Sequence, residues 1–129
     1  MNSEILEELQ RLLDDVCTSS LLVVVEGKKD KACLIKLGVP GKNIITLTKP
    51  LFEVVEDIAA RIEKENLPSK VVLLTDLDTE GKKLYATLAR GLEDRGMDID
   101  NQLRFFLRRK TPVRHIEGLF SYFEKITVN

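Results

Sequence analysis

Residues 71–81 of this 129-residue chain read Val71-Val72-Leu73-Leu74-Thr75-Asp76-Leu77-Asp78-Thr79-Glu80-Gly81. The stretch opens with a continuous apolar run, which is typical of a strand buried on both faces of a parallel sheet. Acids then follow at alternate positions. Residues i and i+2 of an extended chain project to the same side, so we expect Asp76 and Asp78 to aim their carboxylates together. Like charges this close repel unless a cation lies between them, and Mg²⁺ suits oxygen ligands.

A second apolar run, Leu21 to Val25, ends abruptly at Glu26-Gly27. Working outward from these two runs, the apolar spacing predicts strands at 21–25, 44–47, 70–75 and 103–107, with helices between them. It also predicts an N-terminal helix over 4–16 and a last short helix over about 115–125. Such alternation predicts an α/β fold with a mainly parallel four-stranded sheet flanked by helices, because parallel neighbours need crossover helices. We expect one domain over residues 1–129, with its core at about 21–110.

The composition is that of a soluble globular protein, with 43% hydrophobic and 32% charged residues and no apolar run near the roughly 20 residues that span a bilayer. The acidic, amphipathic N-terminus is unlike a signal peptide. Cys17 and Cys33 are isolated, which indicates small core residues in a reducing cytoplasm rather than a disulfide or a zinc site. The net charge of −1 does not by itself indicate binding to a polyanion such as nucleic acid, so the distribution of the charges matters more.

Acids follow two of the predicted strands at their carboxyl ends, the edge at which parallel sheets bind ligands. If the first and third strands are neighbours, the carboxylates of Glu26, Asp76 and Asp78 meet in one crevice. Acids at such positions also cap the following helix, whose N-terminal end is positive. Capping accounts well for Asp30. It does not account for the whole set, because one cap needs one acid and this edge carries five with Glu80 included.

Two motifs, taken jointly, resemble those of the Toprim family. The first is Val23-Val24-Val25-Glu26-Gly27-Lys28-Lys29-Asp30, similar to that of primases and the ribosomal-RNA maturase nuclease. The second is Thr75-Asp76-Leu77-Asp78-Thr79-Glu80-Gly81. The resemblance covers about residues 21–110 and implies a compact Rossmann-like fold. It also implies that Glu26 is a general acid or base or a metal ligand, and that Asp76 and Asp78 hold Mg²⁺. Glu80 matches the third acid of the topoisomerase-type motif and is expected to support the metal.

The chain departs from the larger Toprim enzymes in several features, and these departures limit which members of the family it resembles. Topoisomerases usually carry proline where Leu77 stands and need a separate domain with a nucleophilic tyrosine, whereas Tyr85 and Tyr122 here fall on predicted helices and are expected to pack. Primases need further nucleotide-binding and zinc-binding domains, which we do not expect within these 129 residues. The chain is therefore similar to the small stand-alone Toprim proteins of prokaryotes.

Other α/β families match less well. Haloacid-dehalogenase-like phosphatases carry Asp-x-Asp-x-Thr on their first strand, but here the fifth position is Glu80 and the strand is the third. Receiver domains pair acids near strand one with an aspartate after strand three, whereas this chain has the single Glu26 at the first strand. Gly27-Lys28-Lys29 lacks the Gly-x-x-x-x-Gly-Lys-Ser/Thr phosphate loop, which excludes nucleotide hydrolysis of that type.

Basic residues are predicted to gather at the same edge of the sheet as the acids. They are Lys28, Lys29 and Lys31 after the first strand, Lys49 after the second, Lys82 and Lys83 after the third, and Arg108, Arg109, Lys110 and Arg114 after the fourth. Solvated helix faces account for many single lysines. An acidic metal centre with a basic rim suits a phosphodiester backbone. His115, the only histidine, is either a phosphate contact or proton donor, or a capping or packing residue.

The sequence thus predicts Mg²⁺-dependent phosphoryl transfer on nucleic acid, with nuclease-type phosphodiester hydrolysis as the favoured reaction. Glu26, Asp76 and Asp78 are the expected catalytic residues and, with Glu80, the expected ligands of one or two Mg²⁺ ions, which Mn²⁺ can replace. The alternative is a non-hydrolytic metal-binding module that binds nucleic acid or supports an assembly. DNA and RNA both remain open as partners, as does the oligomeric state.

Overall fold

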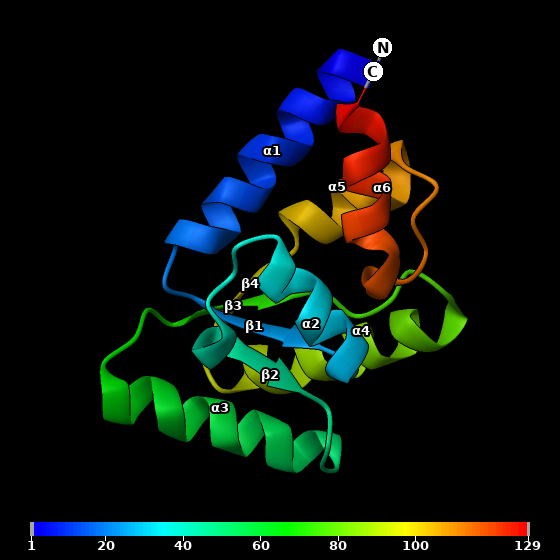
Figure 1. Ribbon diagram of the computed structural model, residues 1–129. Helices are drawn as coiled ribbons and strands as arrows, with labels where there is room; N and C mark the ends of the chain where they lie inside the picture. The colour runs from blue at the N-terminus through cyan, green and yellow to red at the C-terminus, as the bar shows by residue number, and fades with distance from the viewer. Residues whose placement is uncertain (1, 129) are drawn as a thin grey trace.

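The computed structural model describes residues 2–128 and has an α/β fold around one parallel sheet (Figure 1). The strand order is β2-β1-β3-β4, and each neighbouring pair is parallel. The strands are β1 (Leu22–Val25), β2 (Ile44–Thr46), β3 (Lys70–Leu73) and β4 (Asp98–Asp100). Helices flank the sheet on both sides. This arrangement confirms the predicted fold class and is consistent with a Rossmann-like fold.

Alternate residues of the central strands feed two separate hydrophobic cores. Val23 and Val72 belong to the core on one face, and Val24 and Val71 to the core on the other. The first core is covered by α1 (Asn2–Thr18), α2 (Lys28–Lys36), α5 (Gln102–Lys110) and α6 (Leu119–Thr127), and the second by α3 (Leu51–Glu65) and α4 (Thr79–Asp94). Both faces of β1 and β3 are therefore buried, which explains why these strands are apolar throughout.

The chain leaves β1 and β3 toward opposite faces of the sheet. After β1 it enters α2 on one face, and after β3 it enters α4 on the other. The two strands pair directly, with Leu22 beside Val71 and Val24 beside Leu73. Adjacent strands whose connections diverge leave a crevice at their carboxyl ends, where ligands bind in open α/β sheets. The prediction that the first and third strands are neighbours is confirmed.

The predicted fourth strand at 103–107 is wrong, because these residues lie in α5. Leu103 and Leu107 are buried one helical turn apart, whereas Phe105 between them is 54% exposed. The true fourth strand, Asp98–Asp100, lies at the sheet edge and pairs on one side with β3. A three-residue edge strand of sequence Asp-Ile-Asp has no apolar run to mark it. Consequently, Arg108, Arg109 and Lys110 end a helix rather than follow a strand.

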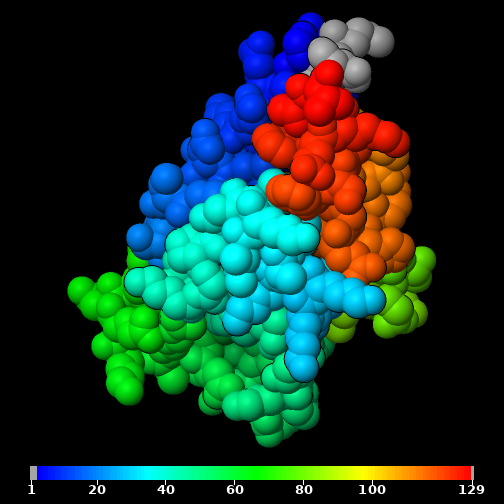
Figure 2. Space-filling view, in the orientation of Figure 1, coloured from blue at the N-terminus to red at the C-terminus, as the bar shows by residue number. Residues whose placement is uncertain are grey.

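The terminal helices also differ from their predicted bounds. The first helix spans Asn2–Thr18 rather than 4–16, and the last spans Leu119–Thr127 after a 3-10 turn, η2, at Ile116–Gly118. A second 3-10 turn, η1 (Gly41–Asn43), precedes β2. In Figure 2, α1, α2 and α6 lie side by side on the face toward the viewer.

The two cysteines are free, Cys33 buried in the core and Cys17 half-buried beside it. None of the helices within residues 2–128 combines the length and the apolarity needed to cross a bilayer.

Candidate metal centre at the carboxyl edge of the sheet

The loop after β3 is held in shape by its own polar contacts. The Thr75 hydroxyl donates to the carbonyl of Gly81 at 2.7 Å, and the Gly81 N–H donates to Asp78 Oδ1 at 2.8 Å. Asp78 is thus the N-cap of α4, as capping chemistry favours. A Cβ at Gly81 would collide with the carbonyl oxygen of Asp76. The final glycine of the motif therefore lets the first turn of α4 pack directly against the acidic loop.

Glu26 reaches the same loop from β1. Its Oε2 accepts a hydrogen bond from the backbone N–H of Asp76 at 2.8 Å. Partial burial raises the pKa of Glu26 from its ordinary value, and the nearby carboxylates of Asp76, Asp78 and Asp30 raise it further, while the Asp76 N–H acts in the opposite direction. Glu26 therefore holds its proton to a higher pH than an exposed glutamate does.

The segment between α5 and η2 closes the third side of the centre. The Ile116 N–H donates to Asp76 Oδ1 at 2.8 Å, and the Leu77 N–H donates to the Arg114 carbonyl at 2.8 Å. These two contacts bring His115 to the loop, where its Nε2 lies 3.3 Å from Asp78 Oδ2. One ligand atom each from Asp76, Asp78 and His115 lies within 4.8 Å of the others.

These donors suit a divalent cation. Asp76 and Asp78 each use Oδ1 to accept a backbone N–H, which orients the carboxylate group. Carboxylate oxygens suit Mg²⁺, and an added imidazole nitrogen suits Mn²⁺ or Zn²⁺ better. Among residues 2–128, the close group does not include Glu26 or Glu80. The Glu80 side chain is 77% exposed and pairs with Lys83 at 4.0 Å, and its supporting role at the metal stays a prediction.

Asp30 is buried beside the centre with 5% of its surface exposed. Its carboxylate accepts the Gly27 N–H at 2.9 Å in the first turn of α2, which bears out the capping interpretation. Burial is the main cause that raises the pKa of Asp30 from its ordinary value, and the Asp76 carboxylate adds to it.

Arg104 is the residue of this region that the sequence analysis missed. Its buried guanidinium donates to the carbonyls of Thr75, at 3.0 Å, and Asp76, at 2.8 Å, and lies 4.8 Å from the ring centre of Tyr85. Burial lowers the pKa of Arg104 from its ordinary value. The positive charge lies behind the acidic loop and offsets part of its repulsion. A helical rather than extended reading of 102–110 would have shown that Leu103, Arg104 and Leu107 share one buried face.

The chain aligns along most of its length with proteins of archaea. It is 32% identical to a UPF0292 protein of Methanocaldococcus jannaschii over 95% of this chain and 89% of the relative. It is also 32% identical to a UPF0292 protein of Pyrococcus horikoshii over the same shares of the two chains. The chain belongs to the UPF0292 family.

No family model matches this UPF0292 chain. A solved structure of a protein from Aquifex aeolicus is similar to it, with a TM-score of 0.67 and 31% identity, covering 90% of this chain and 95% of that one. The shared fold therefore extends over nearly the whole of both chains.

The basic residues of the UPF0292 chain divide into two groups. Lys28, Lys29 and Lys82 are exposed, and Lys31 is half-buried, in the first turns of α2 and α4, which begin at the carboxyl edge of the sheet. The remaining residues of the predicted rim have partners or lie elsewhere: Lys49 pairs with Asp57, Lys83 pairs with Glu80, Arg114 donates to the carbonyls of Thr111 and Val113, and Arg108, Arg109 and Lys110 end α5. Contact of any of them with nucleic acid stays a prediction.

Proposed function

We propose that this chain is a cytoplasmic Toprim-type protein that binds a divalent cation, Mg²⁺ or Mn²⁺, and hydrolyses phosphodiester bonds of nucleic acid. The observation that carries the proposal is the meeting of the Glu26 carboxylate with the Asp76–Asp78 loop at the point where the connections of β1 and β3 diverge. If these acids served only to cap helices, each would need to lie only at the start of its own helix, and they would not need to lie together.

Asp76 and Asp78 are the proposed ligands, because their Oδ1 atoms are fixed by backbone N–H groups and one carboxylate oxygen of each lies within 4.8 Å of a ring nitrogen of His115. A bound divalent cation would neutralise developing charge on the phosphate and activate water. Glu26 is the proposed proton donor or acceptor. Its raised pKa and its place beside the Asp76 backbone suit that role better than ligation.

One observation favours the alternative, a metal-binding module that binds nucleic acid or supports an assembly without hydrolysing anything. Glu26, Asp76 and Asp78 each accept a backbone N–H, so the acidic centre also holds three chain segments together. This structural role alone would account for the three acids, without any catalysed reaction.

A cleavage panel separates the two functions. The purified protein is incubated with Mg²⁺, Mn²⁺ or chelator and labelled single-stranded, duplex and stem-loop RNA and DNA. The proposal expects metal-dependent cleavage of at least one substrate, abolished in the Asp76→Asn variant. Binding without cleavage in every lane would favour the alternative, and neither binding nor cleavage would contradict both.

A further inference from the structure

A hollow with a volume of about 260 Å³ lies between α4 and α5. The residues of its lining that bear on its chemistry are Lys82, Tyr85, Asn101, Arg104, Phe105 and Arg108. Every charged side chain in the lining is basic. Helix α5, from Gln102 to Lys110, carries no acid at all. The hollow is therefore suited to an anionic ligand.

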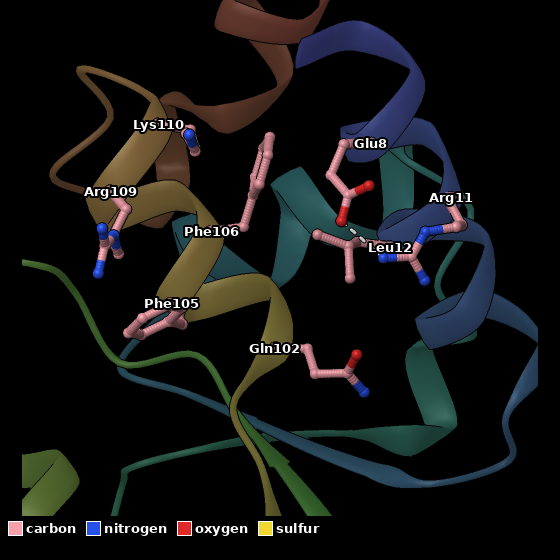
Figure 3. A pocket seen from close by; sticks show the side chains of 8 residues that line it. All are labelled: Glu8, Arg11, Leu12, Gln102, Phe105, Phe106, Arg109 and Lys110. Carbon is pink, nitrogen blue, oxygen red and sulfur yellow. Dashed lines mark hydrogen bonds and ion pairs between the residues drawn. The ribbon is translucent and has the colours of Figure 1, made fainter. Parts of the chain in front are cut away.

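Aromatic rings accompany these cations. The Phe105 side chain is 54% exposed, although a phenylalanine is usually buried. The Arg109 guanidinium lies 5.3 Å from the centre of its ring. Figure 3 shows a neighbouring hollow between α1 and α5, whose lining includes Phe105, Phe106 and Arg109. Phe106 points into the space between the two helices, and Phe105 also belongs to the lining of the hollow between α4 and α5. An exposed ring flanked by cations is typical of surfaces on which nucleic-acid bases stack.

Arg104 reaches from the hollow toward the acidic centre. Its guanidinium lies 4.8 Å from the ring centre of Tyr85, which also lines the hollow. It donates to the carbonyl of Thr75 at 3.0 Å. Because Arg104 also donates to the Asp76 carbonyl, one side chain joins the hollow to the acidic centre.

We propose that the hollow between α4 and α5 binds single-stranded nucleic acid, with a base stacked on Phe105 and the backbone phosphates held by Lys82 and Arg108. The inference rests on the proposed function and adds a preference for strands with unpaired bases. A base in a duplex is already stacked on both faces and cannot cover Phe105. The bound strand would then continue past Arg104 to the Asp76–Asp78 loop.

The test is a fluorescence anisotropy titration of a labelled oligonucleotide, single-stranded or annealed to its complement, with chelator present throughout. The variants are Phe105→Ala, Lys82→Ala and Arg108→Ala. Two variants on α3, away from the hollow, are the matched controls. Phe52→Ala removes an exposed phenylalanine, and Lys64→Ala removes an exposed lysine. Thermal melts verify that each variant folds. RNA and DNA oligonucleotides are both used.

We expect tighter binding of the single strand than of the duplex. Phe105→Ala should weaken single-strand binding about 5- to 150-fold and leave its salt dependence unchanged. Lys82→Ala and Arg108→Ala should each reduce the slope of log affinity against log salt by roughly 0.7. Equal losses in the Phe52→Ala and Phe105→Ala variants would overturn the inference, as would equal affinity for both strand forms or the absence of nucleic-acid binding, the result expected of a protein-binding surface.

Because the titration contains chelator, it does not depend on the metal centre. Phe105-dependent binding without cleavage under any metal condition would leave the hollow assigned and contradict the proposed nuclease function. Metal-dependent cleavage that is unchanged in the Phe105→Ala, Lys82→Ala and Arg108→Ala variants would retain the nuclease function and reject the hollow as the path of its substrate.

Discussion

The Glu26 carboxylate accepts a hydrogen bond from the Asp76 backbone N–H at 2.8 Å, joining the ends of two neighbouring parallel strands across 50 positions of sequence. The contact fixes Glu26 against the acidic loop without making it a member of the Asp76, Asp78 and His115 group. Its position is the basis for proposing two separate tasks, cation binding by the aspartates and proton transfer by the glutamate.

Glu26→Gln tests that separation. The amide oxygen can still accept the Asp76 N–H, but the side chain can no longer exchange a proton. We expect nearly unchanged metal affinity and a cleavage rate reduced by roughly 10²–10⁴-fold, measured in single turnovers. The exposed Glu63→Gln change on α3 serves as the control. If affinity and rate fall together and excess Mg²⁺ restores part of the rate, Glu26 is a ligand instead.

Gly81→Ala should destabilise the protein and disturb the centre. The added Cβ would collide with the Asp76 carbonyl, a backbone atom that cannot move aside as a flexible side chain can. We expect a loss of about 1–3 kcal/mol in the free energy of unfolding, measured by denaturant titration. Gly118→Ala is the matched control, since a Cβ there has no neighbour within 4 Å. Equal stability of the two variants would show that α4 does not need its close approach to the loop.

Asp30→Asn tests the pH dependence. The pKa of Asp30 is raised above its ordinary value of 3.8, so the folded state binds the proton more tightly than the unfolded state. The parent's free energy of unfolding should therefore fall as pH rises from about the ordinary value through the raised one. The variant can keep the contact with Gly27 without a charge, so its advantage over the parent should grow across that window.

The measurement for Asp30→Asn is denaturant unfolding with chelator at a series of pH values, with the exposed Asp14→Asn as the control for the loss of one charge. An advantage that is independent of pH, or one that shrinks as pH rises, would contradict the account of Asp30.

His115→Gln tests the nitrogen donor of the group. Nε2 of His115 lies 3.3 Å from Asp78 Oδ2, close enough for both to contact one ion. Because imidazole favours Mn²⁺ over Mg²⁺, the variant should lose more affinity for Mn²⁺ than for Mg²⁺ in calorimetric titrations. Equal losses for the two ions, or none, would mean that His115 pairs with Asp78 without touching the metal.

The central strands could be predicted from sequence because each is buried on both faces and so leaves a continuous apolar run. The same runs located Glu26, Asp76 and Asp78 at their ends. The edge strand Asp98–Asp100 could not be found this way, since hydrogen bonding to β3 rather than an apolar pattern defines it.

The residues after β4 that contact the acidic loop could not be predicted from the sequence pattern. Ile116 contacts Asp76 across 40 positions of sequence, and His115 contacts Asp78 from the same distant segment. No hydrophobic periodicity encodes contacts between segments so far apart. Arg104 was hidden by the extended interpretation of 103–107. Its helix shows both the buried guanidinium behind Asp76 and the exposed Phe105.

The central claim is that Asp76 and Asp78 hold a divalent cation, and calorimetric titration of Mg²⁺ and Mn²⁺ tests it most directly. Asp76→Asn and Asp78→Asn each keep the backbone hydrogen bond to Oδ1 available and remove one negative charge, with the exposed Asp94→Asn as control. We predict saturable binding to the parent and the control and weaker binding to both variants, which should in turn be more stable than the parent in chelator because repulsion is relieved. Unchanged affinity in both variants, or no metal binding by the parent, would contradict the claim.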